Sequence, residues 1–316
     1  GSSDVCSSDL TMNNGSVANR GTAALSCALL LTACCANNAG AQNFPNRLIR
    51  IMTTAAGGGS DLNARLIAQA LSANLGQQIV VDNRAGTVPN EVVAKAPPDG
   101  YTLLVNGSAV WLLSFLRSGV PFDPLKDFAP VTLAAATPYF ATVNSGLGVT
   151  TLKEFIALAK AKPGQLNFAG AGTGGGAHLA AELFKSLTRV SMTHVPYKGT
   201  APAMIDVAGG HVDLMFASLP GAMAYVQAKK VKAIAISSAK RVSALPGVPT
   251  VIESGVKDYD FTVWFGIVTR AGAPTAVIDK IYADAHAVLN SPDLVKTFAD
   301  QGAQVHERSQ IGRAHV

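Results

Sequence analysis

Cysteine is almost absent from this chain of 316 residues. The four that exist, Cys6, Cys27, Cys34 and Cys35, all fall within the first 35 positions. That stretch carries the export signal described below, so the mature chain is expected to have no cysteine. A chain without cysteine forms no disulfide, thiol nucleophile or thiolate zinc site.

Charged residues and catalytic sequence motifs are also scarce. Only 14% of residues are charged, the net charge is +5, and lysine and arginine form no run, which argues against a nucleic-acid partner. The six histidines are scattered without metal-ligand spacing, and neither G-x-S-x-G, H-E-x-x-H nor a close carboxylate pair occurs. We therefore predict no catalytic residue, no metal and no cofactor, and we expect that the protein is not an enzyme. The 48% hydrophobic content indicates an ordered globular chain.

The two chain ends do not read as natural protein. Residues 4–10 and 311–316 back-translate to the two strands of one sequencing adaptor, and we exclude residues 1–11 and 311–316 from fold reasoning as adaptor-derived. Residues 12–41 have the features of a signal peptide: a positive start at Arg20, a short apolar stretch and a small-residue cleavage site. Cleavage there would release a periplasmic protein, whereas the lipobox ending at Cys34 would anchor it by lipid. Both alternatives stay open. The apolar stretch is shorter than the ~20 residues of a membrane span.

Two glycine-rich turns are the most informative positive feature. Residues 57–62 read GGGSDL and residues 174–179 read GGGAHL, and each follows an apolar extended stretch and opens an amphipathic helix. A strand-glycine-helix turn directs bare backbone N–H groups and the positive end of a helix dipole at one place. The sequence therefore predicts two anion sites, which a ligand with two carboxylates could bridge.

Strand and helix signals alternate from Leu48 onward, which predicts parallel α/β layers. The second unit repeats the opening pattern, which indicates a duplicated two-lobed protein. We place the first lobe at residues 42–144 plus 261–310 and the second at 145–260. The apolar strands near 139–144 and 262–268 are the expected crossovers, and a cleft between the lobes is the expected ligand site.

A nucleotide ligand is disfavoured. Residues 170–175 match G-x-G-x-x-G, but the acidic residue required about 20 positions later is missing from residues 191–196. Neither glycine turn continues into the Lys-Ser/Thr of a P-loop.

Several individual residues can be interpreted in two ways. Asp61 either caps its helix or contacts ligand. His178, at the matching position of the second turn, either donates to a carboxylate or packs at the helix start. Lys198 is either a cleft cation or a solvated turn lysine. The pair Trp264–Phe265 either forms the floor of the cleft or packs in the hydrophobic core.

Six motifs, in order along nearly all of the mature chain, resemble the extracytoplasmic receptors of tripartite tricarboxylate transporters, the Bug receptors. They are AAGGGSD (55–61), VVDNR (80–84), PDGYTLL (98–104), HVPYKG (194–199), VDLMF (212–216) and LPGVPT (245–250). The resemblance implies an α/β, two-lobed periplasmic-binding-protein fold, type II-like, with a hinged interdomain cleft that closes like a Venus flytrap. It also implies a monomeric solute-binding protein that passes a small mono-, di- or tricarboxylate to the membrane subunits of a transporter. An exported enzyme of acyl or nucleotide chemistry and a receptor feeding a sensor system remain alternatives.

The predicted ligand-binding residues come from two arguments. The resemblance assigns ligand roles to Gly57, Gly58, Ser60, Asp61, Thr173, Gly174 and His178. Five more residues are predicted to bind ligand because they lie at strand ends or beside the glycine turns: Thr54, Ser108, Tyr197, Lys198 and Ser218.

The chain departs from the family pattern in three places. Thr53-Thr54 replace the usual Pro-aromatic pair before the first turn, the loop at 87–90 is about three residues short, and the last helix is missing where the adaptor begins. We expect the natural protein to be longer. The sequence leaves the identity of the carboxylate open.

Overall fold

The computed structural model describes residues 44–116 and 118–305. The predicted adaptor segments, the signal peptide and Cys34 lie outside these residues. Residues 45–116 and 118–305 belong to one compact unit, to which all that follows refers.

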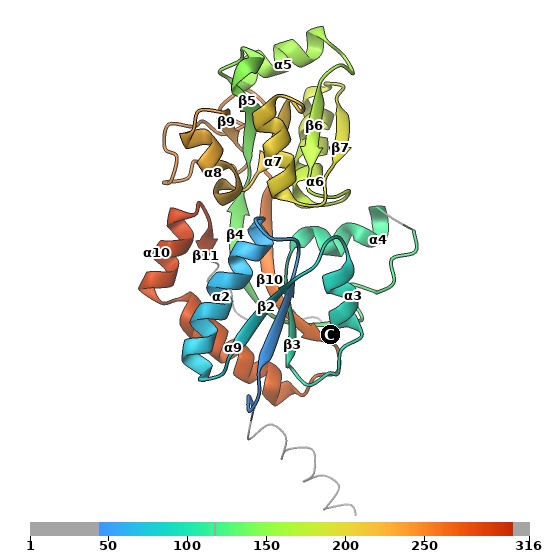
Figure 1. Cartoon of the computed structure of the whole chain (residues 1–316), viewed down its shortest axis with the longest axis vertical. Coiled ribbons are helices and arrows are strands. Elements are labelled where there is room, and N and C mark those ends of the chain that lie inside the picture. The colour runs from blue at the N-terminus through green and yellow to red at the C-terminus, as the bar shows by residue number, and fades with distance from the viewer. Residues whose placement is uncertain (1–43, 117, 306–316) are drawn as a thin grey trace, which may run out of the picture. The chain divides into compact units, whose positions relative to one another are not determined.

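The first lobe is built on a six-stranded sheet in the order β11-β4-β10-β3-β1-β2 (Figure 1). Strands β1, β2 and β3 are mutually parallel, whereas β10 runs antiparallel to both β3 and β4. Its strands are β1 (Ile49–Thr53), β2 (Ile79–Asn83), β3 (Thr102–Gly107), β4 (Phe128–Pro138), β10 (Thr262–Arg270) and β11 (Gln304–Val305). Its helices are α2 (Gly59–Leu75), α3 (Val88–Ala94), η1 (Ser108–Leu112), α4 (Leu113–Leu116), α9 (Thr275–Leu289) and α10 (Pro292–Asp300).

The second lobe has a five-stranded sheet in the order β7-β6-β8-β5-β9. Its strands are β5 (Phe140–Asn144), β6 (Asn167–Gly170), β7 (Thr193–Pro196), β8 (Leu214–Ala217) and β9 (Val231–Ile236). Its helices are η2 (Ser145–Leu147), α5 (Leu152–Ala161), α6 (Gly176–Thr188), α7 (Thr200–Gly209) and α8 (Leu219–Gln227). The parallel trio β7-β6-β8 followed by antiparallel β5 repeats β2-β1-β3 followed by antiparallel β10. This is the duplication that the two glycine turns predict.

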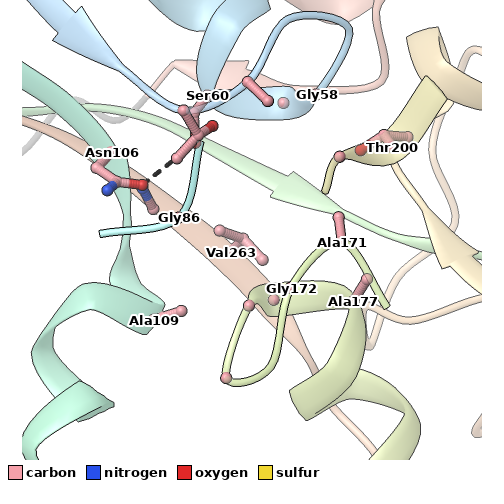
Figure 2. A pocket seen from close by; sticks show the side chains of 18 of the residues that line it. Gly58, Ser60, Gly86, Asn106, Ala109, Ala171, Gly172, Ala177, Thr200 and Val263 are labelled. Atoms are coloured by element: carbon pink, nitrogen blue, oxygen red, sulfur yellow. Dashed lines mark hydrogen bonds between the residues drawn. The ribbon is translucent and has the colours of Figure 1, made fainter. Parts of the chain in front are cut away.

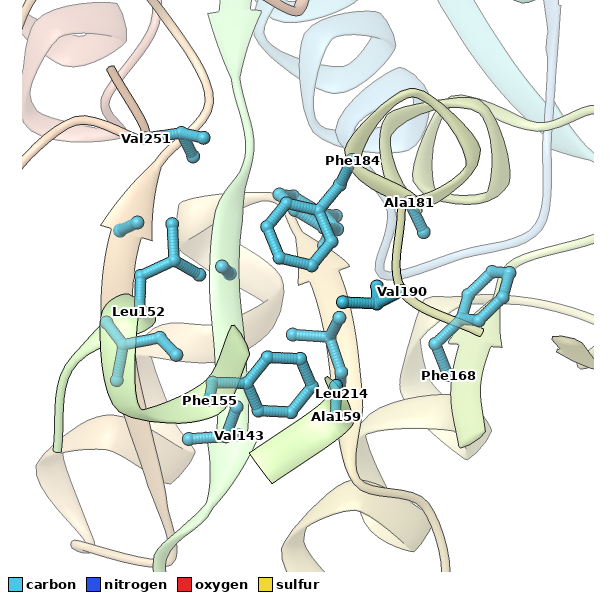
Figure 3. Packing of buried hydrophobic residues seen from close by; sticks show 14 of the residues in the cluster. Val143, Leu152, Phe155, Ala159, Phe168, Ala181, Phe184, Val190, Leu214 and Val251 are labelled. Atoms are coloured by element: carbon cyan, nitrogen blue, oxygen red, sulfur yellow. The ribbon is translucent and has the colours of Figure 1, made fainter. Parts of the chain in front are cut away.

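The core of the second lobe explains how the second turn is held rigid. Phe155 of α5 and Phe184 of α6 pack with ring centroids 6.3 Å apart, and both are fully buried against the sheet with Leu214 (Figure 3). Helix α5 begins with a complete capping box from Thr151 and Glu154. Burying a large apolar side chain contributes about 1.5–3 kcal/mol, so these residues fix α6 on the sheet.

Two extended segments connect the lobes. Strand β4 ends at Pro138 and β5 begins at Phe140, while the return path enters β10 after Phe261. Ser237 joins the two crossings: its hydroxyl accepts from the Tyr139 N–H and donates to the Phe261 carbonyl. The predicted crossovers lie here, but β5, placed in the first lobe by the predicted boundary at 144, pairs with β8 and β9 in the second sheet. The chain changes sheets at Tyr139, five residues before the boundary predicted at residue 144.

Candidate functional site

A cavity of about 490 Å³ lies between the lobes, at the carboxyl ends of the parallel strands. Ser60 and Gly58 of the first turn lie on one side of it, and Gly172 and Ala177 of the second turn lie opposite, with Val263 of β10 between them (Figure 2). Residues from the start of α3, α7 and α8 complete the wall. Five helix N-termini therefore border one cavity.

The first turn is organised by Asp61. Its Oδ2 accepts the Gly57 N–H at 3.0 Å, and its Oδ1 accepts from Asn83 Nδ2 at 2.8 Å and from Arg65 Nε at 2.9 Å. Asn83 in turn donates to the Thr54 carbonyl at 2.7 Å. The Asp61 carboxylate is thus occupied by the protein and supports the turn from behind. The N–H groups of Gly59 and Ser60 precede the first helical hydrogen bond, from Leu62 to Gly58, and have no acceptor within the helix.

The second turn is organised in the same way by a different side chain. His178 Nδ1 accepts the Gly174 N–H at 3.0 Å. The imidazole stacks on His194, with ring centroids 4.0 Å apart, and His178 Nε2 lies 3.7 Å from Glu182 Oε1. The first helical hydrogen bond here runs from Leu179 to Gly175, so the N–H groups of Gly176 and Ala177 have no acceptor within the helix.

An aromatic side chain from a crossing segment lies against each turn. A Cβ added to Gly59 would come within 2.9 Å of Phe265 Cζ, and one added to Gly176 within 2.7 Å of the Tyr139 hydroxyl. Both rings line the cavity, and burial raises the pKa of Tyr139 to about 12. Tyr139 therefore stays neutral and able to donate a hydrogen bond across the physiological pH range. Trp264 lies on the other face of β10 and is 37% exposed, so only Phe265 of the predicted pair reaches the cavity.

The electrostatics of the wall favour an anion. Among its described lining residues there is no aspartate or glutamate, and Lys198, which is exposed, is the single charged side chain. Helix N-termini carry positive partial charge, and backbone N–H groups at such ends bind carboxylate or phosphate. The cavity thus combines several positive helix ends with no opposing acid.

The predicted site residues divide into two groups. Eight of them line the cavity: Thr54, Gly58, Ser60, Thr173, Gly174, Tyr197, Lys198 and Ser218. Four are not among the lining residues: Gly57, Asp61, Ser108 and His178. Three of the four take part in the hydrogen bonds that hold the turns, and Ser108 accepts from the Trp264 N–H at 3.5 Å. The Tyr197 hydroxyl donates to Asp206, and burial together with this bond raises the pKa of Tyr197 to about 12.

Sequence reasoning missed several lining residues. Tyr139 was assigned only to a crossover strand, and Thr87 and Asn90 only to a shortened loop. Asn90 is 1% exposed and accepts from Asn106 Nδ2 at 2.9 Å, while Asn106 Oδ1 accepts from Ser60 Oγ at 3.4 Å (Figure 2). In the sequence, the available signal was polar Thr87 and Asn90 around a proline at the start of a short helix.

Across residues 44–116 and 118–305, no three His, Cys, Asp or Glu side chains cluster as they would to hold a metal ion. None of the helices in the described part of the chain is long and apolar enough to cross a membrane.

Comparison with known proteins identifies the family. Residues 63–314 match the family described as tripartite tricarboxylate transporter family receptor. Protein BugT of Bordetella pertussis is 34% identical over 270 residues, which cover 83% of this chain and 82% of that protein. The structure of Rpa4515 from R. palustris with adipate is similar, with a TM-score of 0.80, 34% identity, and coverage of 83% of this chain and 89% of that one.

A second structure, MatC from Rhodopseudomonas palustris with bound malate, has a TM-score of 0.77 and 31% identity, covering 83% of this chain and 91% of that one. The predicted two-lobed periplasmic-binding-protein fold and the predicted family resemblance are thereby confirmed. The chain belongs to the tripartite tricarboxylate transporter receptor family, whose members are solute-binding proteins.

Proposed function

We propose that this protein is an extracytoplasmic receptor that binds a small mono-, di- or tricarboxylate between its lobes. It would then deliver the acid to the membrane subunits of a tripartite tricarboxylate transporter. The observation that carries the proposal is the cavity wall, where helix N-termini and backbone N–H groups with no acceptor within their helices converge and where no described lining residue is an aspartate or glutamate. Related structures that contain adipate and malate support the carboxylate class.

The size of the cavity supports a small ligand. Ligand pockets commonly measure about 300–1,000 Å³, and this one measures about 490 Å³. The wall also contains apolar atoms from Val110, Leu113, Val263 and Phe265, which would contact the carbon chain of an organic acid.

Contacts across the cleft support closure around the ligand. A Cβ added to Gly57 would lie 3.7 Å from Ala201 Cβ in the second lobe. One added to Gly174 would lie 3.1 Å from Leu116 Cδ1 in the first lobe. Each turn thus touches the opposite lobe, and an anion held by both turns would stabilise this closed arrangement. The paired crossings at Tyr139 and Phe261 are the proposed hinge.

Within this proposal the site residues have different tasks. The eight cavity-lining residues would contact ligand or its hydration water, and Asp61 and His178 would position the turns. The protein would act as a monomer in the periplasm, free or lipid-anchored.

Isothermal titration calorimetry of the full chain with succinate, malate, adipate, citrate and hexanoate tests the proposal. At least one acid is expected to bind and to raise the melting temperature, because a ligand bound only by the folded state stabilises it. Adipamide, which matches adipate in length but has no charge, is the control. Equal binding of adipamide and adipate, or no binding of any acid, would contradict the carboxylate assignment. Uptake of the bound acid by cells with and without the receptor tests delivery to a transporter.

A further inference from the structure

The first lobe contributes a third surface to the cavity, apart from the two glycine turns. It is formed by the loop before α3, the first turn of α3, the end of β3 and the start of η1. Figure 2 shows Gly86, Asn106 and Ala109 of this surface on the side of the cavity that lies across from Gly172. We refer to six of its residues as the α3 wall: Ala85, Gly86, Thr87, Asn90, Asn106 and Ala109.

The side-chain amides of the α3 wall have a fixed direction. The Gly107 N–H donates to Asn106 Oδ1 at 2.8 Å, so the other end of the Asn106 amide is its NH2 group. Asn106 Nδ2 donates to Asn90 Oδ1 at 2.9 Å, which orients the Asn90 amide in turn. The NH2 group of Asn90 is therefore the end of that amide turned away from Asn106.

This NH2 group is a buried donor without a protein acceptor. Asn90 is 1% exposed, and within residues 44–116 and 118–305 its side chain makes one hydrogen bond, the one that its oxygen accepts. Leaving a buried donor without an acceptor costs free energy. Because Asn90 lines the cavity, an oxygen atom inside the cavity can supply the missing acceptor.

The charges around the α3 wall suit an uncharged oxygen better than a carboxylate. All six residues of the wall are uncharged, whereas Lys198 lies in the second lobe. The Thr87 hydroxyl donates to Glu91 Oε1 at 2.7 Å, so a carboxylate stands directly behind this wall. Glu91 would repel a ligand carboxylate placed here, and no lysine or arginine of the wall offsets that repulsion. A hydroxyl or keto oxygen has no charge to repel, and one or two N–H groups satisfy it.

The α3 wall also adjoins the first glycine turn. Ser60 Oγ donates to Asn106 Oδ1 at 3.4 Å, and Ser60 itself lines the cavity (Figure 2). The chain of hydrogen bonds from Ser60 through Asn106 to Asn90 thus connects the turn with the free NH2 group. A carbon chain that extends from an acid group at the turn can carry an oxygen substituent to Asn90.

We infer that the ligand is a carboxylic acid with a hydroxyl or keto oxygen on its carbon chain, and that Asn90 Nδ2 donates a hydrogen bond to that oxygen. This inference rests on the proposed function and narrows the ligand from carboxylates in general to oxygenated ones. Asn90 is then a specificity-determining residue. It favours an oxygenated acid over the acid of the same length and charge that lacks the oxygen.

Matched pairs of acids test this inference in the full chain. The members of each pair share a carbon skeleton and differ in one hydroxyl or keto oxygen: 3-hydroxybutyrate and butyrate, malate and succinate, 2-oxoglutarate and glutarate, citrate and tricarballylate. Calorimetry gives both affinities, with the two enantiomers of each chiral acid measured separately. In at least one pair the unaltered chain is expected to bind the oxygenated acid about three- to tenfold more tightly, the range of one hydrogen bond between uncharged groups.

Two substitutions separate the donor from the structural role of Asn90. Asn90→Asp keeps an oxygen that accepts from Asn106 and removes the NH2 group, whereas Asn90→Ala removes both. Asn290→Ala is the control, because Asn290 Nδ2 donates to the His286 carbonyl and Asn290 is not among the cavity-lining residues. The preference for the oxygenated acid is expected to disappear in both Asn90 variants, even if the affinity for both members of a pair falls. It should persist in Asn290→Ala.

The ratio of the two affinities is the deciding measurement, since a general loss of stability weakens both members of a pair alike. Equal affinities within every pair in the unaltered chain would overturn the inference, because the Asn90 donor would then be bound to water. A preference that persists in both Asn90→Asp and Asn90→Ala would also overturn it. If none of these acids binds the unaltered chain, the proposed function fails and the inference fails with it, which is distinguishable from binding without preference.

Discussion

The backbone N–H of Gly174 donates a hydrogen bond to Nδ1 of His178, 3.0 Å away and four residues further along the chain. Gly57 donates to Asp61 across the same spacing and the same distance. The two lobes therefore hold equivalent turns with a carboxylate in one case and an imidazole in the other. This relationship gives each turn its own sensitivity to substitution.

Asp61→Ala is expected to destabilise the first lobe. Asp61 is 6% exposed, and its carboxylate accepts from Gly57 and Asn83, which would be left without this acceptor. Leaving buried donors unsatisfied costs about 1–3 kcal/mol each. Chemical denaturation should show a loss of that order in the free energy of unfolding. Asp300→Ala, which removes an exposed ion pair with Lys296, should show almost no loss; equal losses in both variants would refute the role of Asp61.

His178→Ala is expected to weaken acid binding about tenfold, since the Gly174 turn loses the acceptor that orients it. His178→Asn is the matched control, because its side-chain oxygen can occupy the position of Nδ1 and accept the same N–H. Calorimetry should show that His178→Asn binds the acid with the affinity of the unaltered chain. If alanine and asparagine behave alike, the hydrogen bond to Gly174 does not matter for binding.

Stability is expected to fall as pH decreases below the unfolded-state pKa of histidine, about 6.5. Burial and the neighbouring His178 and Lys185 lower the pKa of His194, although Glu182 acts in the opposite direction. A base with a lowered pKa binds fewer protons in the folded state than in the unfolded state. The resulting loss of stability is absent well above pH 6.5, develops as pH falls through that value, and is complete below the folded-state pKa.

Thermal denaturation between about pH 8 and about pH 5 measures this dependence. His194→Phe keeps a ring to stack on Phe168 and His178 but cannot be protonated, so it should reduce the pH dependence. His286→Gln, at an exposed position of α9, should leave it intact. An unchanged pH dependence in His194→Phe would show that other groups cause it.

Gly176→Ala is expected to damage both stability and binding. The added Cβ would lie 2.7 Å from the Tyr139 hydroxyl and 3.0 Å from Val263 Cγ2, where the cavity wall meets the crossing strands. Overpacking of this kind costs about 1–3 kcal/mol. Gly247→Ala, where a Cβ meets nothing within 4 Å, is the control for both measurements. A Gly176→Ala variant with unaltered melting temperature and affinity would show that the wall accommodates the methyl group.

Much of the fold could be predicted from local sequence. The alternation of apolar strands with amphipathic helices leads to two α/β lobes, and the repeated GGGSDL and GGGAHL segments lead to the matched turns at the ends of β1 and β6. The lobe boundary was harder to place, because the crossing at Tyr139 lies between two strands, β4 and β5, separated by one residue. Periodicity alone does not show where an extended segment leaves one sheet for another.

The site was predictable only in part. Gly58, Ser60, Thr173 and Gly174 line the cavity because a turn after a parallel strand necessarily faces the carboxyl edge of its sheet. The directions of the Asp61 and His178 side chains were not predictable, since either could face the cavity or its own turn. The packing around the first turn of each helix decides which of these two directions the side chain takes.

The sequence by itself determined the class of protein: a duplicated α/β chain with two matched glycine turns, GGGSDL and GGGAHL. Tertiary structure alone decided which residues line the cavity between the two turns. Thr200 lies 142 positions after Gly58, and Tyr139 lies far from both turns, yet the arrangement of the lobes brings all of them to one cavity. Such contacts depend on how two separately folded lobes meet, and no local pattern in the chain encodes that meeting.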